Sequence, residues 1–306
     1  MSIFDLFRKK VTEEPETVSD SIPKAGESES MDRSSVDAEA KVTVNVKEGN
    51  QKSETKTFDD VAPKNIGKLD MVIAFDTTGS MAQYIDAVRK EVTDLIPQLF
   101  KENEDLRLGI VAFGDYCDMK NPQEFGDAYQ SIAPTDNANE LIGFVLTSKD
   151  TNGGDGDEFY ELVIKRIVEE TPWREGSTRS ILLIADSAPH QLGYTYGKCV
   201  VNNQIDWRTE ARNASDKRIK IDTVTITDEP WFKELSRMTN GISVPFRTGY
   251  KTAGLVRASV MSRGSMKARM CFDELMGACE ESDDEEMKEV FRSYKKERDS
   301  YDHTDA

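Results

Sequence analysis

Three oxygen-bearing side chains occupy alternate positions in the segment Phe75–Met81. They are Asp76, Thr78 and Ser80, and they come directly after an apolar stretch with the composition of a buried strand. Because they are spaced two apart in a turn, their oxygens can converge on one point, and Gly79 permits the tight backbone path that brings Ser80 round. One carboxylate and two hydroxyls form a hard donor set, which suits Mg²⁺ or Mn²⁺ rather than a soft metal.

Apolar segments of this kind recur along the chain and alternate with segments of helical periodicity. Apolar residues step by three or four positions in Ile85–Leu99 and in Leu162–Val168, which predicts helices there. The alternation predicts βαβ units, and therefore an α/β fold with a Rossmann-like open, mostly parallel sheet and helices on both faces. Ligands bind at the carboxyl ends of the strands in such sheets, where Asp76 is expected. The predicted strands are Leu69–Phe75, Leu106–Phe113, Ser180–Ala185 and Ile219–Ile226, with Tyr129–Ala133 as a short antiparallel edge strand and Ile242–Phe246 as the last strand.

The distribution of charge divides the 306 residues into three parts. The chain has 40 Lys and Arg against 57 Asp and Glu, a net charge of −17, which argues against DNA or RNA binding as a main role. Residues 1–65 are predicted to form a disordered acidic arm, because residues 11–60 carry 13 acidic and 6 basic side chains and no aromatic residue before Phe58. Residues 66–262 are predicted to form the α/β domain, and residues 263–306 a charged helical C-terminal extension.

The N-terminus and the cysteines give expectations about where the protein acts. Residues 1–10 place four apolar side chains before three basic ones, so they are predicted either to dock weakly on a partner or an anionic membrane, or to form a frayed terminus. No apolar run approaches the ~18 residues that span a membrane, so no transmembrane segment is expected. The four cysteines have no CxxC spacing and are too sparse for a disulfide scaffold, which predicts reduced thiols in a cytoplasmic protein.

The segment Asp76-Thr77-Thr78-Gly79-Ser80 resembles the first loop of a metal-ion-dependent adhesion site, which reads Asp-x-Ser/Thr-x-Ser in von Willebrand factor A domains. In that family a Thr from a second loop and an Asp from a third complete the site. The resemblance implies that Thr151 or Asp155 is the second-loop ligand, and that Asp186, at the end of an apolar strand, is the third. The Gly153-Gly154-Asp155 run of the second loop and the Pro189-His190 pair resemble the loops of an intracellular subgroup of the family. This subgroup includes members associated with alpha-kinases and tellurite-resistance-type bacterial clusters.

The resemblance implies a protein-binding module that is not an enzyme. It implies a Mg²⁺ ion, with Mn²⁺ or Ca²⁺ as alternatives, whose coordination is completed by a carboxylate of a protein partner. A haloacid-dehalogenase-type phosphatase needs a second Asp where Thr78 stands, no GxxxxGK[ST] loop is present, and Ser80 does not lie in a G-x-S-x-G elbow. A metal-dependent hydrolase and a structural scaffold with an unoccupied metal site are the alternative functions.

Several of these residues also have an ordinary structural interpretation. The acids of the second loop can be first-turn residues that complement a helix dipole. His190 is either a hydrogen-bonded structural histidine or a site residue, and Asp115 is either a solvated loop acid or a contact at the rim of the site.

Overall fold

The computed structural model describes residues 67–121, 124–195, 204–246 and 250–302. The predicted acidic arm and its N-terminal docking segment lie outside these residues. Within the described part of the chain, no helix is both long enough and apolar enough to cross a bilayer.

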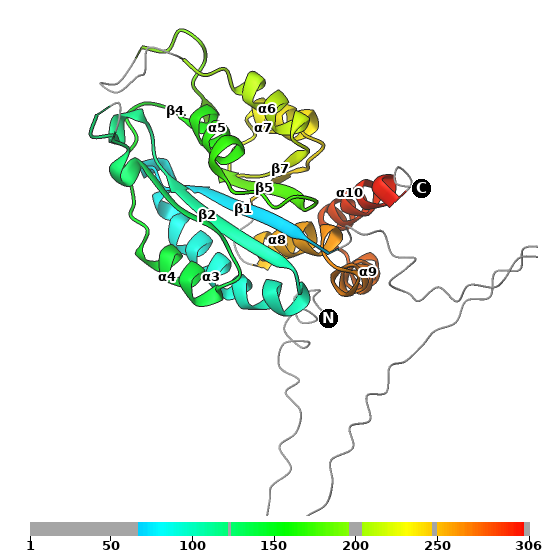
Figure 1. The fold of residues 1–306 in the computed structure, drawn as a ribbon. Coiled ribbons are helices and arrows are strands. Elements are labelled where there is room, and N and C mark those ends of the chain that lie inside the picture. Colours follow the sequence, from blue (N-terminus) through cyan, green and yellow to red (C-terminus); the bar gives the residue numbers. More distant parts are fainter. Residues whose placement is uncertain (1–66, 122–123, 196–203, 247–249, 303–306) are drawn as a thin grey trace, which may run out of the picture. The chain divides into compact units, whose positions relative to one another are not determined.

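Six strands form one sheet in the order β3-β2-β1-β5-β7-β8 (Figure 1). Among these strands, only β3 runs antiparallel to its neighbour, which is β2. The predicted open, mostly parallel sheet and its antiparallel edge strand are confirmed. The strands are β1 (Leu69–Asp76), β2 (Leu106–Phe113), β3 (Tyr129–Thr135), β5 (Thr178–Ala185), β7 (Ile219–Thr225) and β8 (Ser243–Pro245), and a separate two-stranded sheet pairs β4 (Asp157–Glu158) with β6 (Ala188–Pro189).

Helices cover both faces of the sheet, as the sequence predicts. Figure 1 shows α3, α4 and α8 on one face and α5, α6 and α7 on the other. Neighbouring helices of each layer contact one another. The helices are α3 (Ile85–Glu102), α4 (Ala138–Thr147), α5 (Tyr160–Glu170), α6 (Trp207–Asp216), α7 (Pro230–Met238), α8 (Tyr250–Arg263), α9 (Met266–Glu280) and α10 (Glu285–Asp302).

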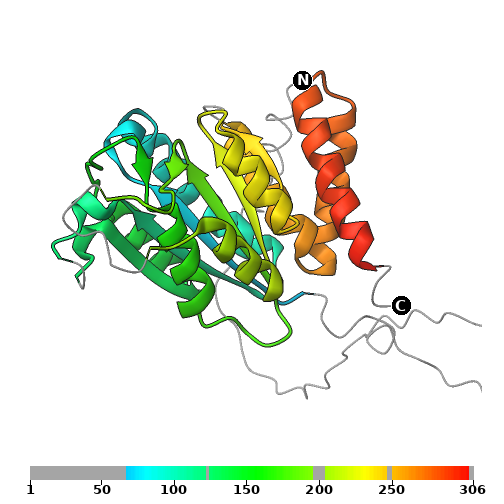
Figure 2. The ribbon, with the colours of Figure 1, turned by 90° about the horizontal axis from the view of Figure 1, so that it is seen from above.

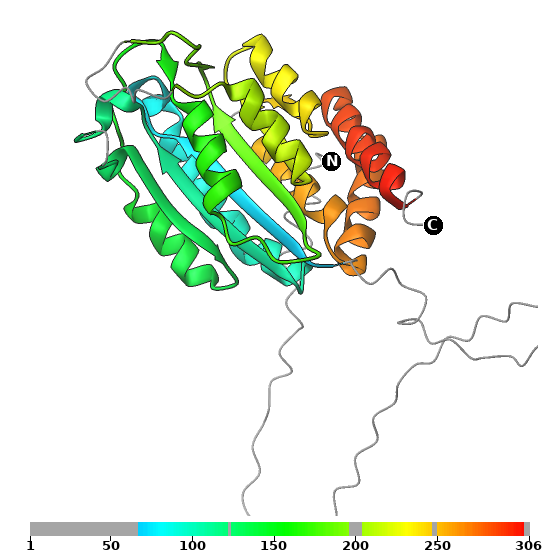
Figure 3. The same ribbon diagram turned by 45° about the horizontal axis from the view of Figure 1, so that its top comes forward.

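The register of the central strands brings three loops to one edge of the sheet. Pairing places Asp76 of β1 opposite Phe113 of β2, and Phe75 opposite Ile184 of β5. Because these strands are parallel, their carboxyl ends lie side by side, and the loops that follow them gather at the same edge (Figures 1 and 3). All residues of β1 are buried, so this edge is built on the rigid centre of the sheet.

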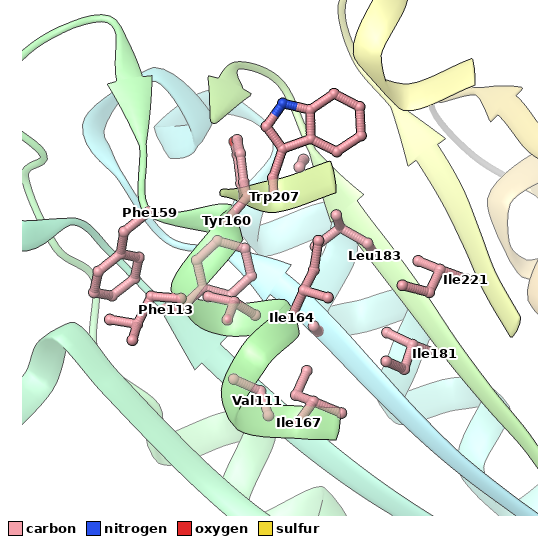
Figure 4. Packing of buried hydrophobic residues seen from close by; sticks show 14 of the residues in the cluster. Val111, Phe113, Phe159, Tyr160, Ile164, Ile167, Ile181, Leu183, Trp207 and Ile221 are labelled. Carbon is pink, nitrogen blue, oxygen red and sulfur yellow. The ribbon is translucent and has the colours of Figure 1, made fainter. Parts of the chain in front are cut away.

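An aromatic cluster between α5 and the sheet supports this edge (Figure 4). Phe113 meets Tyr160 edge to face, with ring centroids 5.6 Å apart, and Trp231 stacks on the same tyrosine ring at 5.2 Å. Aromatic pairs of this geometry are attractive beyond their area burial, so they fix the orientation of the Tyr160 ring. The tyrosine hydroxyl group is thereby held at the end of β1.

The helices of the predicted C-terminal extension are anchored on the α/β domain. α9 and α10 pack against α8 (Figure 2). At the end of α8, Nη2 of Arg263 donates to Asp222 Oδ1 of β7 at 3.0 Å and to Glu297 Oε2 of α10 at 2.8 Å. Arg263 and Asp222 are both buried, and the Tyr294 hydroxyl donates to Asp222 at 3.2 Å. A buried ion-pair network therefore joins the extension to the sheet.

Candidate metal centre

The first loop brings its three oxygen-bearing side chains together at the end of β1. Asp76 is fully buried, and its Oδ1 accepts hydrogen bonds from the backbone nitrogen of Thr78 at 2.8 Å and from the Thr78 hydroxyl at 2.7 Å. The Thr78 and Ser80 hydroxyl oxygens lie 3.2 Å apart. The convergence expected from the alternate spacing of these residues is thus present.

Tyr160 holds the other oxygen of Asp76. Its hydroxyl donates to Asp76 Oδ2 at 2.6 Å and accepts a hydrogen bond from the backbone nitrogen of Ser187 at 3.2 Å. One side chain from α5 therefore ties the first loop to the third. Sequence reasoning missed Tyr160, because it occupies an apolar position of the α5 helical pattern and nothing local distinguishes its hydroxyl from a core aromatic ring.

The second loop runs alongside the first. The backbone nitrogen of Thr151 donates to the carbonyl oxygen of Thr77 at 2.9 Å, and the two threonine hydroxyls lie 3.1 Å apart. Thr151 also lies close to Gly114, the residue after β2, where an added Cβ atom would be only 2.5 Å from Thr151 Oγ1. The Asp118 carboxylate accepts from the backbone nitrogens of Asn152 and Gly153 at 2.9 and 3.0 Å, which fixes the path of the loop.

The third loop supplies Asp186, which follows β5. The side chain is buried, and its Oδ1 has no hydrogen-bond partner. Burial raises the pKa of Asp186, and a hydrogen bond from the Ser80 hydroxyl opposes that rise. The first and third loops therefore meet through Ser80 and Asp186, as the register of β1 and β5 requires.

The acid of the second loop that reaches this group is Glu158, in β4. Its side chain is buried, and its Oε2 has no hydrogen-bond partner. Burial and the charges of Asp76 and Asp115 raise the pKa of Glu158 to about 10, while the Thr78 hydroxyl opposes the rise. The sequence shows only that Glu158 stands three residues after Asp155. The signal that it points inward is the pairing of β4 with β6, which is non-local.

Asp155, in contrast, lies with Asp115 and His190. Ligand atoms of these three side chains are all within 4.8 Å of one another. Nε2 of His190 lies 2.7 Å from Asp115 Oδ1, and the Tyr194 hydroxyl donates to Asp155 Oδ2 at 2.9 Å. His190 is thus hydrogen-bonded, as its structural interpretation predicts. Asp115 is fully buried and is not a solvated loop acid.

Neighbouring carboxylates contribute to the raised pKa values of Asp76 and Glu158. Burial raises the pKa of Asp76 to about 7 and the charge of Asp186 adds to this rise, although hydrogen bonds from Tyr160 and Thr78 oppose it. A divalent cation would stabilise the ionised carboxylates. The donors are all oxygens, and Asp186 Oδ1 and Glu158 Oε2 are buried without partners. These residues therefore fit a hard cation such as Mg²⁺.

A mostly parallel α/β sheet with helices on both faces places the chain in the class of doubly wound domains, which bind their ligands at the carboxyl edge of the sheet where these oxygens gather. Residues 70–248, more than half of the chain, match the family model of the von Willebrand factor type A domain, and the chain belongs to that family.

Among solved structures, the fold is similar to that of the conserved hypothetical protein BatB from Bacteroides thetaiotaomicron. The two sequences are 14% identical, the match covers 61% of this chain and 95% of that one, and the TM-score is 0.44. No curated protein matches the chain closely enough to serve as a relative.

Proposed function

We propose that this protein is a Mg²⁺-dependent protein-interaction module that binds a carboxylate of its partner at the carboxyl edge of the sheet. The observation that carries the proposal is the convergence of Asp76, Thr78, Ser80 and Asp186, which belong to loops more than a hundred residues apart in sequence. Membership in the von Willebrand factor type A family supports an interaction role.

The donors for the ion are Asp76, Thr78 and Ser80 from the first loop, with Thr151 and Asp186 from the other two. When bound, Mg²⁺ supplies a Lewis acid that attracts an acidic group of the partner. Tyr160 donates a hydrogen bond to Asp76 Oδ2. The other carboxylate oxygen, Oδ1, lies beside the Thr78 hydroxyl and is the one that would bind the cation. Neutral hydroxyls make up much of the donor set, so they leave the cation electron-poor toward a further carboxylate.

We further propose that binding occurs without turnover. A serine nucleophile of the Ser-His-acid type needs a histidine within hydrogen-bond distance. Ser80 instead contacts Thr78 and Asp186, and His190 Nε2 is engaged by Asp115 at 2.7 Å. A cytoplasmic location, predicted from the cysteines, is part of the same proposal. Cys117 and Cys279 are free thiols, which supports a reducing compartment.

Calorimetric titration of the full chain with Mg²⁺ tests the proposal. We expect saturable binding for the wild type and its loss in Asp76→Asn. Asp136→Asn, which removes an exposed carboxylate from the loop between β3 and α4, is the matched control and should bind like the wild type. Capture of partner proteins with and without a chelator should show the same pattern. Mg²⁺ binding that survives in Asp76→Asn would refute the assignment, and Mg²⁺-dependent hydrolysis of a phosphate ester that is lost in Asp76→Asn would favour the hydrolase.

A further inference from the structure

We infer that Asp115, Asp155 and His190 form a second metal site, built for a borderline transition-metal cation such as Zn²⁺ and separate from the oxygen-only centre. The inference adds a binding site to the proposed function and does not depend on it. It rests on the position of these three side chains and on two buried polar atoms without hydrogen-bond partners, one on His190 and one on Glu161.

The three side chains lie close together, and a cation bound by all three would replace the hydrogen bond between His190 and Asp115. Nε2 of His190 and Oδ1 of Asp115 are 2.7 Å apart, and the ligand atoms of all three residues lie within 4.8 Å of one another. Zinc–nitrogen and zinc–oxygen bonds of about 2.0–2.2 Å require ligand atoms roughly 3.3 Å apart in a tetrahedral site. His190 and Asp115 are buried and fixed, whereas Asp155 is exposed and can move the remaining distance.

A second, independent feature concerns Nδ1, the ring nitrogen of His190 that would face away from the cation. The histidine is only 3% exposed, yet its Nδ1 has no hydrogen-bond partner. Beside it, Glu161 is 1% exposed and its Oε2 also has no partner, while its Oε1 accepts from the Tyr116 hydroxyl at 2.8 Å.

His190 and Glu161 line the same small cavity of about 10 Å³, which is close to the volume that one water molecule needs. Metal-ligating histidines commonly donate their second ring N–H to a carboxylate, directly or through water. Glu161 is therefore in place to orient His190 when Nε2 gives its lone pair to a cation.

The donor types select the class of metal. One imidazole nitrogen with two carboxylates suits Zn²⁺ and its neighbours better than Mg²⁺ or Ca²⁺, which prefer oxygen alone.

The site also joins the loops that build the first centre. Asp155 lies four residues after Thr151, and His190 lies four residues after Asp186. β4, which follows Asp155, pairs with β6, which precedes His190, and Glu158 lies opposite Pro189. A cation shared by Asp155 and His190 would clamp the second and third loops together beyond this short ladder, and so fix the positions of the donors for Mg²⁺.

Titration of the metal-free full chain with Zn²⁺ in saturating Mg²⁺ tests the inference. We expect one Zn²⁺ per chain for the wild type. Asp155→Asn and His190→Gln should lower the affinity for Zn²⁺ by more than the roughly 10- to 100-fold that loss of an outer-shell partner causes. Since Asp155 is exposed, its variant tests the site without disturbing the core. The matched control is His303→Gln, because His303 is the only other histidine of the chain.

Asp76→Asn separates the two centres, since it should retain Zn²⁺ binding while losing Mg²⁺. Substitution with Co²⁺ gives a second readout, in which visible absorption bands of the bound ion should be present in the wild type and absent in His190→Gln. Zn²⁺ affinity that is unchanged in Asp155→Asn, or that disappears in Asp76→Asn, would overturn the inference. Absence of stoichiometric Zn²⁺ binding by the wild type would do the same.

Discussion

Proton competition at Asp76 gives the sharpest prediction for Mg²⁺ binding. Burial raises the pKa of this carboxyl group to about 7 in the metal-free protein, and the cation requires the ionised form. With that pKa, about 10% of the molecules carry ionised Asp76 at pH 6 and about 90% at pH 8. The apparent dissociation constant for Mg²⁺ should therefore be about tenfold lower at pH 8 than at pH 6.

Calorimetric titration at pH 6, 7 and 8 in one buffer series measures this change, together with the proton released on binding. If Asp76 alone competes, the affinity levels off above pH 8. If Glu158, whose pKa is about 10, must also ionise, the affinity continues to rise at higher pH. A dissociation constant that does not change between pH 6 and pH 8 would refute the reasoning, because it would mean that the ion does not displace a proton from Asp76.

The same raised pKa affects the stability of the metal-free fold. A carboxyl group whose pKa is higher in the folded than in the unfolded chain stabilises the fold below its unfolded pKa, and that contribution is lost as pH rises through the folded value. For Asp76 the window runs from about pH 4 to about pH 7. This pH dependence is expected for the metal-free protein, in the presence of a chelator. A bound cation would stabilise the ionised carboxylate and so remove the dependence.

Three further substitutions follow from the contacts. Tyr160→Phe keeps the ring packing but removes a hydrogen bond to a buried charge, so thermal unfolding should show a loss of about 1.5–3 kcal/mol, and the pH midpoint of Mg²⁺ binding should move upward with the pKa of Asp76. Gly114→Ala would push a Cβ against Thr151, so Mg²⁺ affinity should fall while circular dichroism stays native; an unchanged affinity would contradict the placement of the second loop. Arg263→Ala leaves the buried carboxylate of Asp222 in β7 without its cation, while Glu297 of α10 keeps Lys220, and chemical denaturation should show a loss of about 3–5 kcal/mol.

Much of the fold could be predicted from the sequence because its central strands are buried on both faces. A strand such as β1 has to be apolar along its whole length, and that pattern is visible without knowledge of its neighbours. The antiparallel strand β3 was predicted as a short edge strand, and none of its residues is fully buried. Its length was underestimated, because the strand continues to Thr135 through Pro134.

The site was predictable only as far as its chemistry is local. Asp76, Thr78 and Ser80 share one turn, so their convergence follows from spacing alone. The orientation of Asp155 and Glu158 depends on β4, which is two residues long and exists because it pairs with β6. No local pattern shows which way those two acids point. Sequence reasoning left the second-loop ligand open between Thr151 and Asp155, because the Gly-Gly-Asp run is similar to a variant of that loop.

Long-range polar pairs were not predictable for the same reason. His190 and Asp115 are 75 residues apart, and Arg263 and Asp222 are 41 apart. A charged residue in a helix usually faces solvent, so Arg263 at the end of α8 gave no sign that it is buried. The charged sequence of the C-terminal helices likewise does not show whether they pack on the domain. The ion-pair network around Asp222 shows that they do.

The most direct test of the central claim is a crystal structure of the full chain soaked in Mn²⁺, with the ion located by its anomalous scattering. The account predicts a peak at the carboxyl end of β1, bounded by oxygens of Asp76, Ser80 and Asp186. An absence of any peak there at saturating Mn²⁺, with Asp76 still bonded to Thr78 and Tyr160, would contradict it.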